Sequence, residues 1–419
     1  MRRPRLAGLL VDATPLRRDP AFRRLWTSQS ASALGREAVK LALPLQVFLL
    51  TGSAAAAGVL SLVQLVPGLI APLWGGALAD AHDRRRLLAL SQAGLGGTIA
   101  ALALLSLLPQ PPVLVIFACG GLMSILFGVE HPARIASVPR VVAPERLRAA
   151  LALSALAFQV TAIVGPAIAG LLIGIADATA VYVFATAVYA FAAVASFRLP
   201  ELHPGGAGRR STTTMIREGI AWVRSRPTIL GAFAIDIDAV VFGLPVAVFP
   251  VLAIGAFGIG PAEVGLLVAA RGVGALGAAL FSGWVGSVVR VGRAVLVAVA
   301  AYALATCVIG LATGLLWLAV IAIVVAGAVD VLSAVLRAAI VQHVTPDALR
   351  GRVTAIHVLL VTSAPRIGDV RATFMAELFG SQVALVAGGL LALGGVAVVA
   401  RAFPTFARYR EGDAAAEAS

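Results

Sequence analysis

Long apolar stretches follow one another through this chain of 419 residues, and they limit its fold more than any other feature. A helix of about 20 apolar residues is long enough to cross the hydrocarbon core of a bilayer. The chain is 60% hydrophobic, which is more than soluble domains carry. The pattern predicts an all-α membrane protein with twelve transmembrane helices. The expected spans are about 22–49, 55–79, 87–108, 113–138, 150–175, 179–197, 228–254, 262–288, 294–312, 315–342, 353–378 and 382–402.

The basic residues are distributed between the loops in a way that predicts sidedness. The net charge of +13 could suggest nucleic acid, but the arginines lie in short loops and at the ends of apolar runs instead of forming one basic face. We therefore exclude nucleic acid as a partner. Alternate loops lack Lys and Arg, so the positive-inside rule places both termini in the cytoplasm. The loops without Lys or Arg are 51–54, 109–112, 176–180, 255–262, 312–315 and 379–382.

Neither an enzyme nor a metal protein is indicated by the motifs. The two cysteines, Cys119 and Cys307, lie in apolar runs, and the five histidines show no ligand spacing. No glycine-rich phosphate loop followed by Lys and Ser or Thr occurs. The glycines of 272–277 have dinucleotide-loop spacing but lie inside an apolar helix, where they favour helix packing. We expect no cofactor and no metal.

Charged residues inside the expected spans are the candidates for function. Each costs at least roughly 2.5–3.5 kcal/mol at a helix centre, so it should be paired or line water. For any one of these residues, a structural salt bridge between helices is as good an explanation as a functional role. A buried carboxylate can also titrate near neutral pH, which proton coupling needs. The substrate or proton-coupling candidates are Arg36, Glu37, Lys40, Asp236, Asp238, Arg271, Asp330, Arg337, Arg366 and Asp369.

One group of these candidates lies on a single helix face. Arg36 and Lys40 are four residues apart in the first span. Such cations would suit an anionic substrate. Glu37 lies beside them, and a structural pair of Glu37 with Lys40 explains the cluster equally well.

An internal repeat connects the two halves of the chain. The motif at 144–148, PERLR, returns as PDALR at 346–350, each after a matching apolar run. When the two copies are aligned, Arg134 corresponds to Arg337. The spacing predicts a duplication of a six-helix unit.

The turn at 75–86 resembles the signature loop between helices 2 and 3 of the major facilitator superfamily. Gly76, Asp80 and the Arg84-Arg85 pair match the pattern, while Ala81 and Asp83 depart from it. The resemblance implies that Asp80 meets basic residues when the cytoplasmic side closes. The gating candidates are Gly76, Asp80, Arg84, Arg85 and Arg134.

Further stretches resemble exporter branches of the same superfamily. Gly165-Pro166 with Gly170 is similar to the helix-packing motif of fifth helices in exporters. Other stretches resemble the branch of enterobactin-type siderophore exporters and its actinobacterial-type relatives. They are 19–23, 132–134, 200–202, 242–245, 347–352 and 365–369.

The resemblance implies two pseudo-symmetric six-helix halves around a central cavity lined by the first helices of each three-helix repeat. We expect a monomer in the bacterial inner membrane. The linker should contain an amphipathic helix over 214–224. The expected parts are a cytoplasmic arm at 1–20, halves at 21–198 and 228–402, a linker at 199–227 and a tail at 403–419.

The main hypothesis is a secondary-active exporter that moves a small molecule, such as a siderophore, against inward proton flow by alternating access. Asp236, Asp330 and Asp369 are the expected proton carriers. The alternative is a multidrug/proton antiporter with a broad hydrophobic substrate range. A lipid-modifying enzyme or sensor would need a catalytic cluster or an appended domain, and neither is indicated by the chain.

Overall fold

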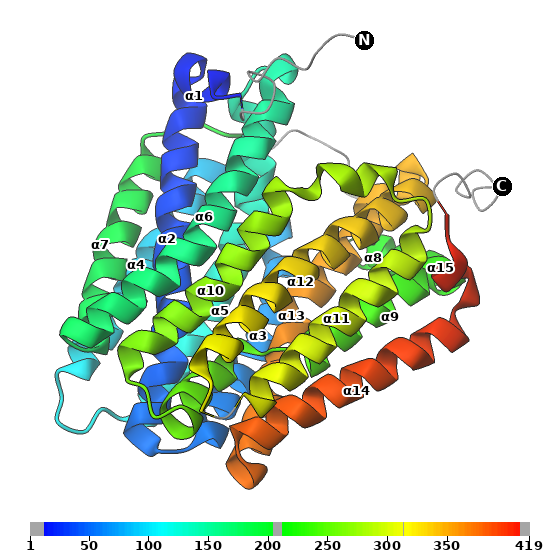
Figure 1. The fold of residues 1–419 in the computed structure, drawn as a ribbon. Helices are drawn as coiled ribbons and strands as arrows, with labels where there is room; N and C mark the ends of the chain where they lie inside the picture. Colours follow the sequence, from blue (N-terminus) through cyan, green and yellow to red (C-terminus); the bar gives the residue numbers. More distant parts are fainter. Residues whose placement is uncertain (1–11, 204–211, 313, 411–419) are drawn as a thin grey trace. The chain divides into compact units, whose positions relative to one another are not determined.

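The computed structural model describes residues 12–203, 212–312 and 314–410, and helices make up nearly all of them. No strand occurs in this part of the chain (Figure 1). Short helices are α1 (Thr14–Arg18), η2 (Pro144–Arg146), α8 (Thr212–Arg224) and α15 (Pro404–Arg408). The long helices are α2 (Pro20–Thr51), α3 (Ala54–Ala81), α4 (Arg84–Ser106), α5 (Val113–Val141), α6 (Leu147–Ile175), α7 (Ala178–Phe197), α9 (Pro227–Phe242), α10 (Pro261–Leu280), α11 (Val291–Leu311), α12 (Leu316–Val344), α13 (Asp347–Phe379) and α14 (Ser381–Ala402).

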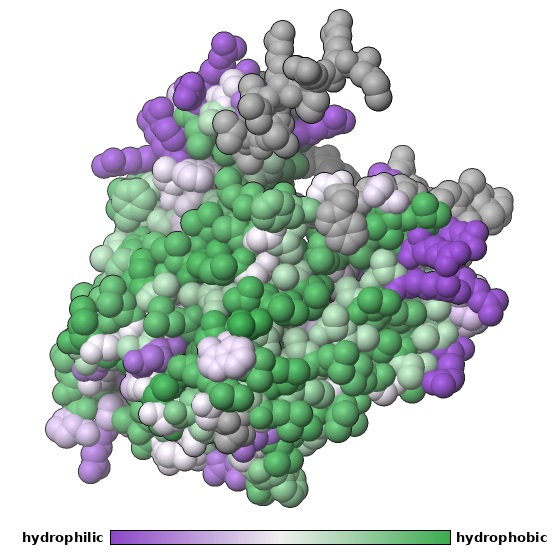
Figure 2. All heavy atoms as spheres, viewed as in Figure 1, coloured by the Kyte–Doolittle hydropathy of each residue, from purple (hydrophilic) through white to green (hydrophobic). Residues whose placement is uncertain are grey.

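The twelve long helices of the described chain confirm the predicted all-α membrane fold. Eleven helical segments are long and apolar enough to cross a membrane. The twelfth is α2, which has the length but carries Arg36, Glu37 and Lys40 near its centre. Large apolar side chains such as Leu114 and Trp74 are exposed, and most of the visible surface is hydrophobic (Figure 2). Exposed apolar side chains are stable when they contact lipid tails, so this surface fits a protein that lies in a membrane.

The described chain forms two compact units, and the first contains residues up to 42 and from 67 to 203. Here α4 packs along α7 and beside α5 (Figure 1). Small residues allow these helices to approach closely. A Cβ at Gly35 or Gly96 would press on the Tyr189 side chain, and a Cβ at Gly165 would overlap α2 beside Glu37. The first member of the Gly165-Pro166 motif therefore lies at a helix crossing.

The second unit contains residues 43–66 and the described chain from 212 onward. In it α11 packs against both α12 and α14, and α10 packs against α12. The crossing of α10 and α12 is held close by a reciprocal pair of glycines. A Cβ at Gly274 would overlap the carbonyl of Val324, and one at Gly327 would overlap the carbonyl of Arg271. Gly274, within the glycine stretch 272–277, thus serves helix packing.

The hairpin at 43–66 groups with the second unit, although the sequence assigns these residues to the first half. Gly58 lies so close to α13 that a Cβ would overlap the Thr373 hydroxyl. Glu377 of α13 accepts a hydrogen bond from the backbone N–H of Ala55, 3.1 Å away, at the start of α3. A carboxylate there satisfies a free amide at the positive end of the helix.

The linker helix α8 covers the expected stretch 214–224 and packs against α13. Glu218 of α8 forms a 2.5 Å ion pair with Arg352 of α13. The linker residues 204–211, the first part of the expected arm (1–11) and the end of the expected tail (411–419) lie outside the described residues.

The seventh span is not the continuous helix that the sequence predicts over 228–254. Helix α9 ends at Phe242, and after Gly243-Leu244-Pro245 the chain continues as short helices η3 (Val246–Val248) and η4 (Val251–Ala256). Proline lacks the N–H that a continuing helix needs, which explains the break. The eighth span also ends early, since α10 stops at Leu280 and gives way to the short helix η5 (Ser282–Ser287).

Candidate functional site

Asp236, Arg337 and His357 come together from three helices of the second unit. Oδ1 of Asp236, on α9, lies 2.8 Å from Nη2 of Arg337 on α12. Its Oδ2 lies 3.1 Å from Nε2 of His357 on α13. Arg337 also donates to the Ser333 hydroxyl one turn earlier, and the His357 ring stacks on Phe233. One carboxylate therefore joins the guanidinium of one helix to the imidazole of another.

The burial of this cluster is uneven. The side chains of Asp236 and Arg337 are each 5% exposed, whereas that of His357 is 28% exposed. A buried ion pair is held together by the cost of leaving either charge alone. His357 is therefore the most exposed member of the cluster.

A second ion pair lies on the same helix α12. Nη2 of Arg271, on α10, lies 3.1 Å from Oδ2 of Asp330. Asp330 precedes Arg337 by seven residues, so the two charged side chains lie on one face of α12, two turns apart. Arg271 also donates to the carbonyl of Leu244 at 3.5 Å. This second contact ties the pair to the break after α9.

Side chains from three helices bind the backbone groups that the break at 243–245 leaves free. Leu244 N–H donates to the Tyr302 hydroxyl of α11 at 3.0 Å. Ala247 N–H donates to Oδ1 of Asp369 of α13 at 3.1 Å. Both acceptors replace helix carbonyls, as broken helices within membranes require.

The carbonyls on the other side of the break are bound by α13. Arg371 donates from Nε to the carbonyl of Val241 at 3.0 Å and from Nη2 to that of Phe242 at 3.5 Å. The structure thus gives Arg271 and Asp369 a structural partner in the backbone. Their part in transport stays a prediction, as does that of Arg366, whose Nη1 lies 4.0 Å from Asp369 on the same helix.

Asp238 does not join Asp236. Two residues along a helix turn the side chain about 200°, so Asp238 faces α14 instead of α12 and α13. A Cβ at Gly395 of α14 would overlap its carboxyl group. The residue is 6% exposed, and its Oδ2 has no hydrogen-bond partner among the described residues. The structure therefore separates two neighbouring candidates by environment.

In the first unit, the cluster around Glu37 is an internal salt bridge. Glu37 is buried, and its oxygens lie 3.2 Å from Nε of Arg36 and 3.4 Å from Nζ of Lys40. The Arg36 guanidinium lies over two rings, 4.7 Å from the centroid of Phe127 on α5 and 5.3 Å from that of Phe158 on α6. Cation–π contacts of this kind fix the guanidinium in place.

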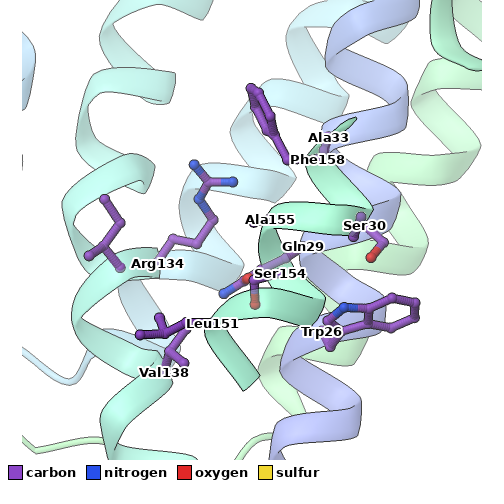
Figure 3. Close-up of a pocket in the computed structure, with 12 residues that line it drawn as sticks. Trp26, Gln29, Ser30, Ala33, Arg134, Val138, Leu151, Ser154, Ala155 and Phe158 are labelled. Atoms are coloured by element: carbon purple, nitrogen blue, oxygen red, sulfur yellow. The ribbon is translucent and has the colours of Figure 1, made fainter. Parts of the chain in front are cut away.

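A cavity of about 220 Å³ opens next to this cluster, between α2, α5 and α6. Figure 3 shows Arg134 reaching into it from α5 and Gln29 from α2. Gln29 is buried, yet its Nε2 has no partner among the described residues. Arg134 forms no ion pair with the described residues, and Glu130 one turn earlier accepts a hydrogen bond from Gln92 at 3.0 Å. The other lining residues are Trp26, Ser30, Ala33, Ile135, Val138, Leu151, Ser154, Ala155, Ala157 and Phe158.

In the signature loop, Asp80 pairs with a residue of the same loop. Asp80 is 81% exposed and contacts Arg84 of the same loop at 3.5 Å. The buried Arg84 donates to the carbonyls of Ala79 and Ala136 at 3.1 and 3.0 Å. Gly76 has open space where a Cβ would be. The gating role of these residues stays a prediction, and Arg134 lies in the cavity.

Asp83, which departs from the superfamily pattern, stabilises the loop through hydrogen bonds to the backbone. Its Oδ1 accepts hydrogen bonds from the N–H groups of Arg85 and Leu202, both at 3.0 Å. Arg85 in turn lies 3.5 Å from Glu201. An Asp just before a helix is a capping signal, and it could have predicted this role. His357 and Tyr302 could not be assigned that way, since their partners Asp236 and Leu244 are distant in sequence.

The repeated motif carries one more ion pair outside the membrane spans. Arg146 donates from Nη2 and Nε to the two carboxylate oxygens of Asp19, at 2.7 and 2.8 Å. These hydrogen bonds hold the pKa of Asp19 below its ordinary value of 3.8. The bidentate pair fixes the start of α2 to the start of α6.

No three His, Cys, Asp or Glu side chains gather as metal ligands within 12–203, 212–312 and 314–410. The candidate residues of the second unit lie in ion pairs and at a broken helix, and those of the first unit lie in an ion-pair cluster and beside a cavity.

Known proteins are similar over most of the chain. A family model described as "Transmembrane secretion effector" matches residues 12–417. The enterobactin exporter EntS of Citrobacter koseri is 27% identical over 349 residues, which cover 83% of each chain. That of Escherichia coli O1:K1 / APEC is 27% identical over 351 residues, again 83% of each.

Solved structures share the fold. A bacterial homologue of the human lysosomal transporter Spinster has a TM-score of 0.72 at 14% identity, and the match covers 93% of this chain and 98% of that one. A bacterial homologue of ferroportin has a TM-score of 0.70 at 14% identity, covering 93% and 99%. Because the family model spans nearly the whole chain and the solved neighbours share its fold, the protein belongs to the Transmembrane secretion effector family of the major facilitator superfamily, whose members are transporters and not enzymes.

Proposed function

We propose that this protein is a small-molecule exporter driven by inward proton flow, and that its cargo is a siderophore of the enterobactin type. Similarity to the enterobactin exporters supports the cargo class. The contact of Asp236 with both Arg337 and His357 supports proton coupling. The protein would work by alternating access in the bacterial inner membrane.

The coupling step follows from the charges of the cluster. When Asp236 is ionised, it satisfies Arg337 and accepts from His357. A proton taken up by His357 strengthens its bond to Asp236, and transfer of that proton to Asp236 neutralises the carboxylate. Arg337 then loses its counter-charge in a buried place, which favours a rearrangement of α9 against α12. Release of the proton restores the pair.

Everted membrane vesicles test export directly. An acidic interior should drive uptake of a tris-catecholate siderophore, and collapse of the pH gradient with nigericin should abolish accumulation. His357→Gln should remove most gradient-driven uptake, because it removes the exchangeable proton. It should retain exchange of labelled for unlabelled siderophore, which needs no net proton movement.

The control is His343→Gln, since His343 is exposed at the end of α12. Equal gradient-driven uptake by wild type and His357→Gln would contradict coupling through this cluster. Uptake of ethidium in place of the siderophore would contradict the cargo class and favour the multidrug antiporter.

A further inference from the structure

Residues that line the cavity of the first unit stand at the same positions of the repeat as the residues of the ion cluster in the second unit. Helices α2 and α9 both begin at a proline. Gln29 and Asp236 each lie nine residues after that proline, and Trp26 and Phe233 each lie six residues after it. The amide of the first half thus stands where the second half has its carboxylate.

The remaining members correspond in the same way. Helices α5 and α12 both have 29 residues, and Arg134 and Arg337 each lie 21 residues after the first residue. Ala155 and His357 each lie eleven residues after the proline that opens the repeated motif. The first half therefore keeps the arginine, replaces the acid with an amide and replaces the imidazole with a methyl group.

These two replacements explain the cavity physically. Asp236 and His357 contact each other and Arg337 in the second unit. Their counterparts leave about 220 Å³ of space, and within the described chain Arg134 forms no ion pair, with Glu130 as the acid one turn away on α5. A guanidinium without a directly bonded carboxylate keeps N–H donors that a ligand or water can satisfy.

The balance of charges in the first unit also favours an external anion as a ligand. Its membrane-embedded cations are Arg36, Lys40 and Arg134, and its acids are Glu37 and Glu130. Glu37 is shared by Arg36 and Lys40, and Glu130 lies one turn from Arg134, so the cations of this group outnumber its acids by one. An external anion would restore neutrality.

The lining residues indicate which kind of anion fits. Trp26 and Phe158 are the aromatic residues that line the cavity, and Nε2 of Gln29 has no hydrogen-bond partner among the described residues. A cavity of about 150 Å³ already accepts benzene, so this one has room for one substituted ring. Arginine binds a carboxylate through two parallel hydrogen bonds.

We propose that this cavity is a binding subsite for an aromatic ring that bears a carboxylate or phenolate, with Arg134 as the anion partner, Gln29 as a second donor and Trp26 and Phe158 against the ring. The inference rests on the proposed function, for which it names the substrate chemistry. It differs from the gating role that the sequence suggested for Arg134.

Equilibrium binding of radiolabelled benzoate to the purified full-length protein tests the subsite without transport. Benzamide has the same shape without the charge, and acetate has the charge without the ring. Benzoate should bind at least about tenfold more tightly than either, since charge-assisted hydrogen bonds and ring burial each contribute.

Three variants assign binding to the cavity. Arg134→Gln should weaken benzoate binding at least about tenfold. Gln29→Asp should do the same, because it supplies the internal counter-charge that the second half has, while Gln29→Asn should bind within about threefold of wild type. Arg140→Gln, at the exposed end of α5, is the matched control and should bind as wild type.

Equal binding of benzoate and benzamide would overturn the proposal, as would unchanged benzoate binding by folded Arg134→Gln and Gln29→Asp proteins. Gel filtration and thermal unfolding establish that the variants are folded. Specific benzoate binding without siderophore export would leave the subsite in place and contradict the proposed function. Export without specific benzoate binding would do the reverse.

Discussion

Two aspartates, two residues apart on α9, show how far the environment of a residue determines its chemistry. Asp236 lies between Arg337 and His357, where its charge is needed. Asp238 lies against Gly395 of α14, and its Oδ2 has no hydrogen-bond partner among the described residues. A buried carboxylate without a partner is most stable when protonated, and a protonated carboxyl group resembles an amide in shape and charge.

We therefore expect Asp236→Asn to destabilise the protein by roughly 3–5 kcal/mol, since it leaves Arg337 buried without a counter-charge. Asp238→Asn should change the free energy of unfolding by less than about 1 kcal/mol. Thermal unfolding in detergent measures both. A larger loss for Asp238→Asn than for Asp236→Asn would contradict this assignment of charge.

At the scale of elements, the broken seventh span is held by other helices. Tyr302, Asp369, Arg271 and Arg371 each bind a backbone group at or near the break. Membrane-embedded backbone must find partners within the protein, so these side chains stabilise a shape that α9 could not keep alone. Several charges that look functional in the sequence thus have a structural task.

Tyr302→Phe should cost about 1–2 kcal/mol of unfolding free energy, because Leu244 N–H loses its buried acceptor. The control is Tyr189→Phe. Tyr189 is equally buried, but its hydroxyl has no hydrogen bond with the described residues. Denaturation of the two variants in parallel measures the difference. A Tyr302→Phe protein as stable as Tyr189→Phe would show that the hydroxyl does not support the break.

At the scale of the whole molecule, sidedness follows from the loop charges. Loops such as 109–112 and 176–180 carry no Lys or Arg, while the loop at 139–148 carries Arg140, Arg146 and Arg148. Basic residues stay on the cytoplasmic side, so alternate loops should face opposite compartments.

Single cysteines introduced into a Cys119→Ala, Cys307→Ala background test this arrangement. An impermeant maleimide added to intact cells should label Gln110→Cys and Ala176→Cys. It should label Glu145→Cys and Arg350→Cys only after permeabilisation. The reverse pattern would place both termini outside the cytoplasm.

The all-α membrane fold and the number of spans could be predicted from the sequence, because hydropathy and helix length show which segments suit a lipid environment. The repeat also showed that Arg134 corresponds to Arg337. The packing of the helices was needed to show that Asp236 and not Asp238 meets Arg337, and that α9 breaks at 243–245. It was also needed to show that Arg134 lines a cavity while Glu37 pairs with Arg36 and Lys40. Those outcomes depend on which helix faces which, and side chains from distant helices set that order by packing and by pairing charge.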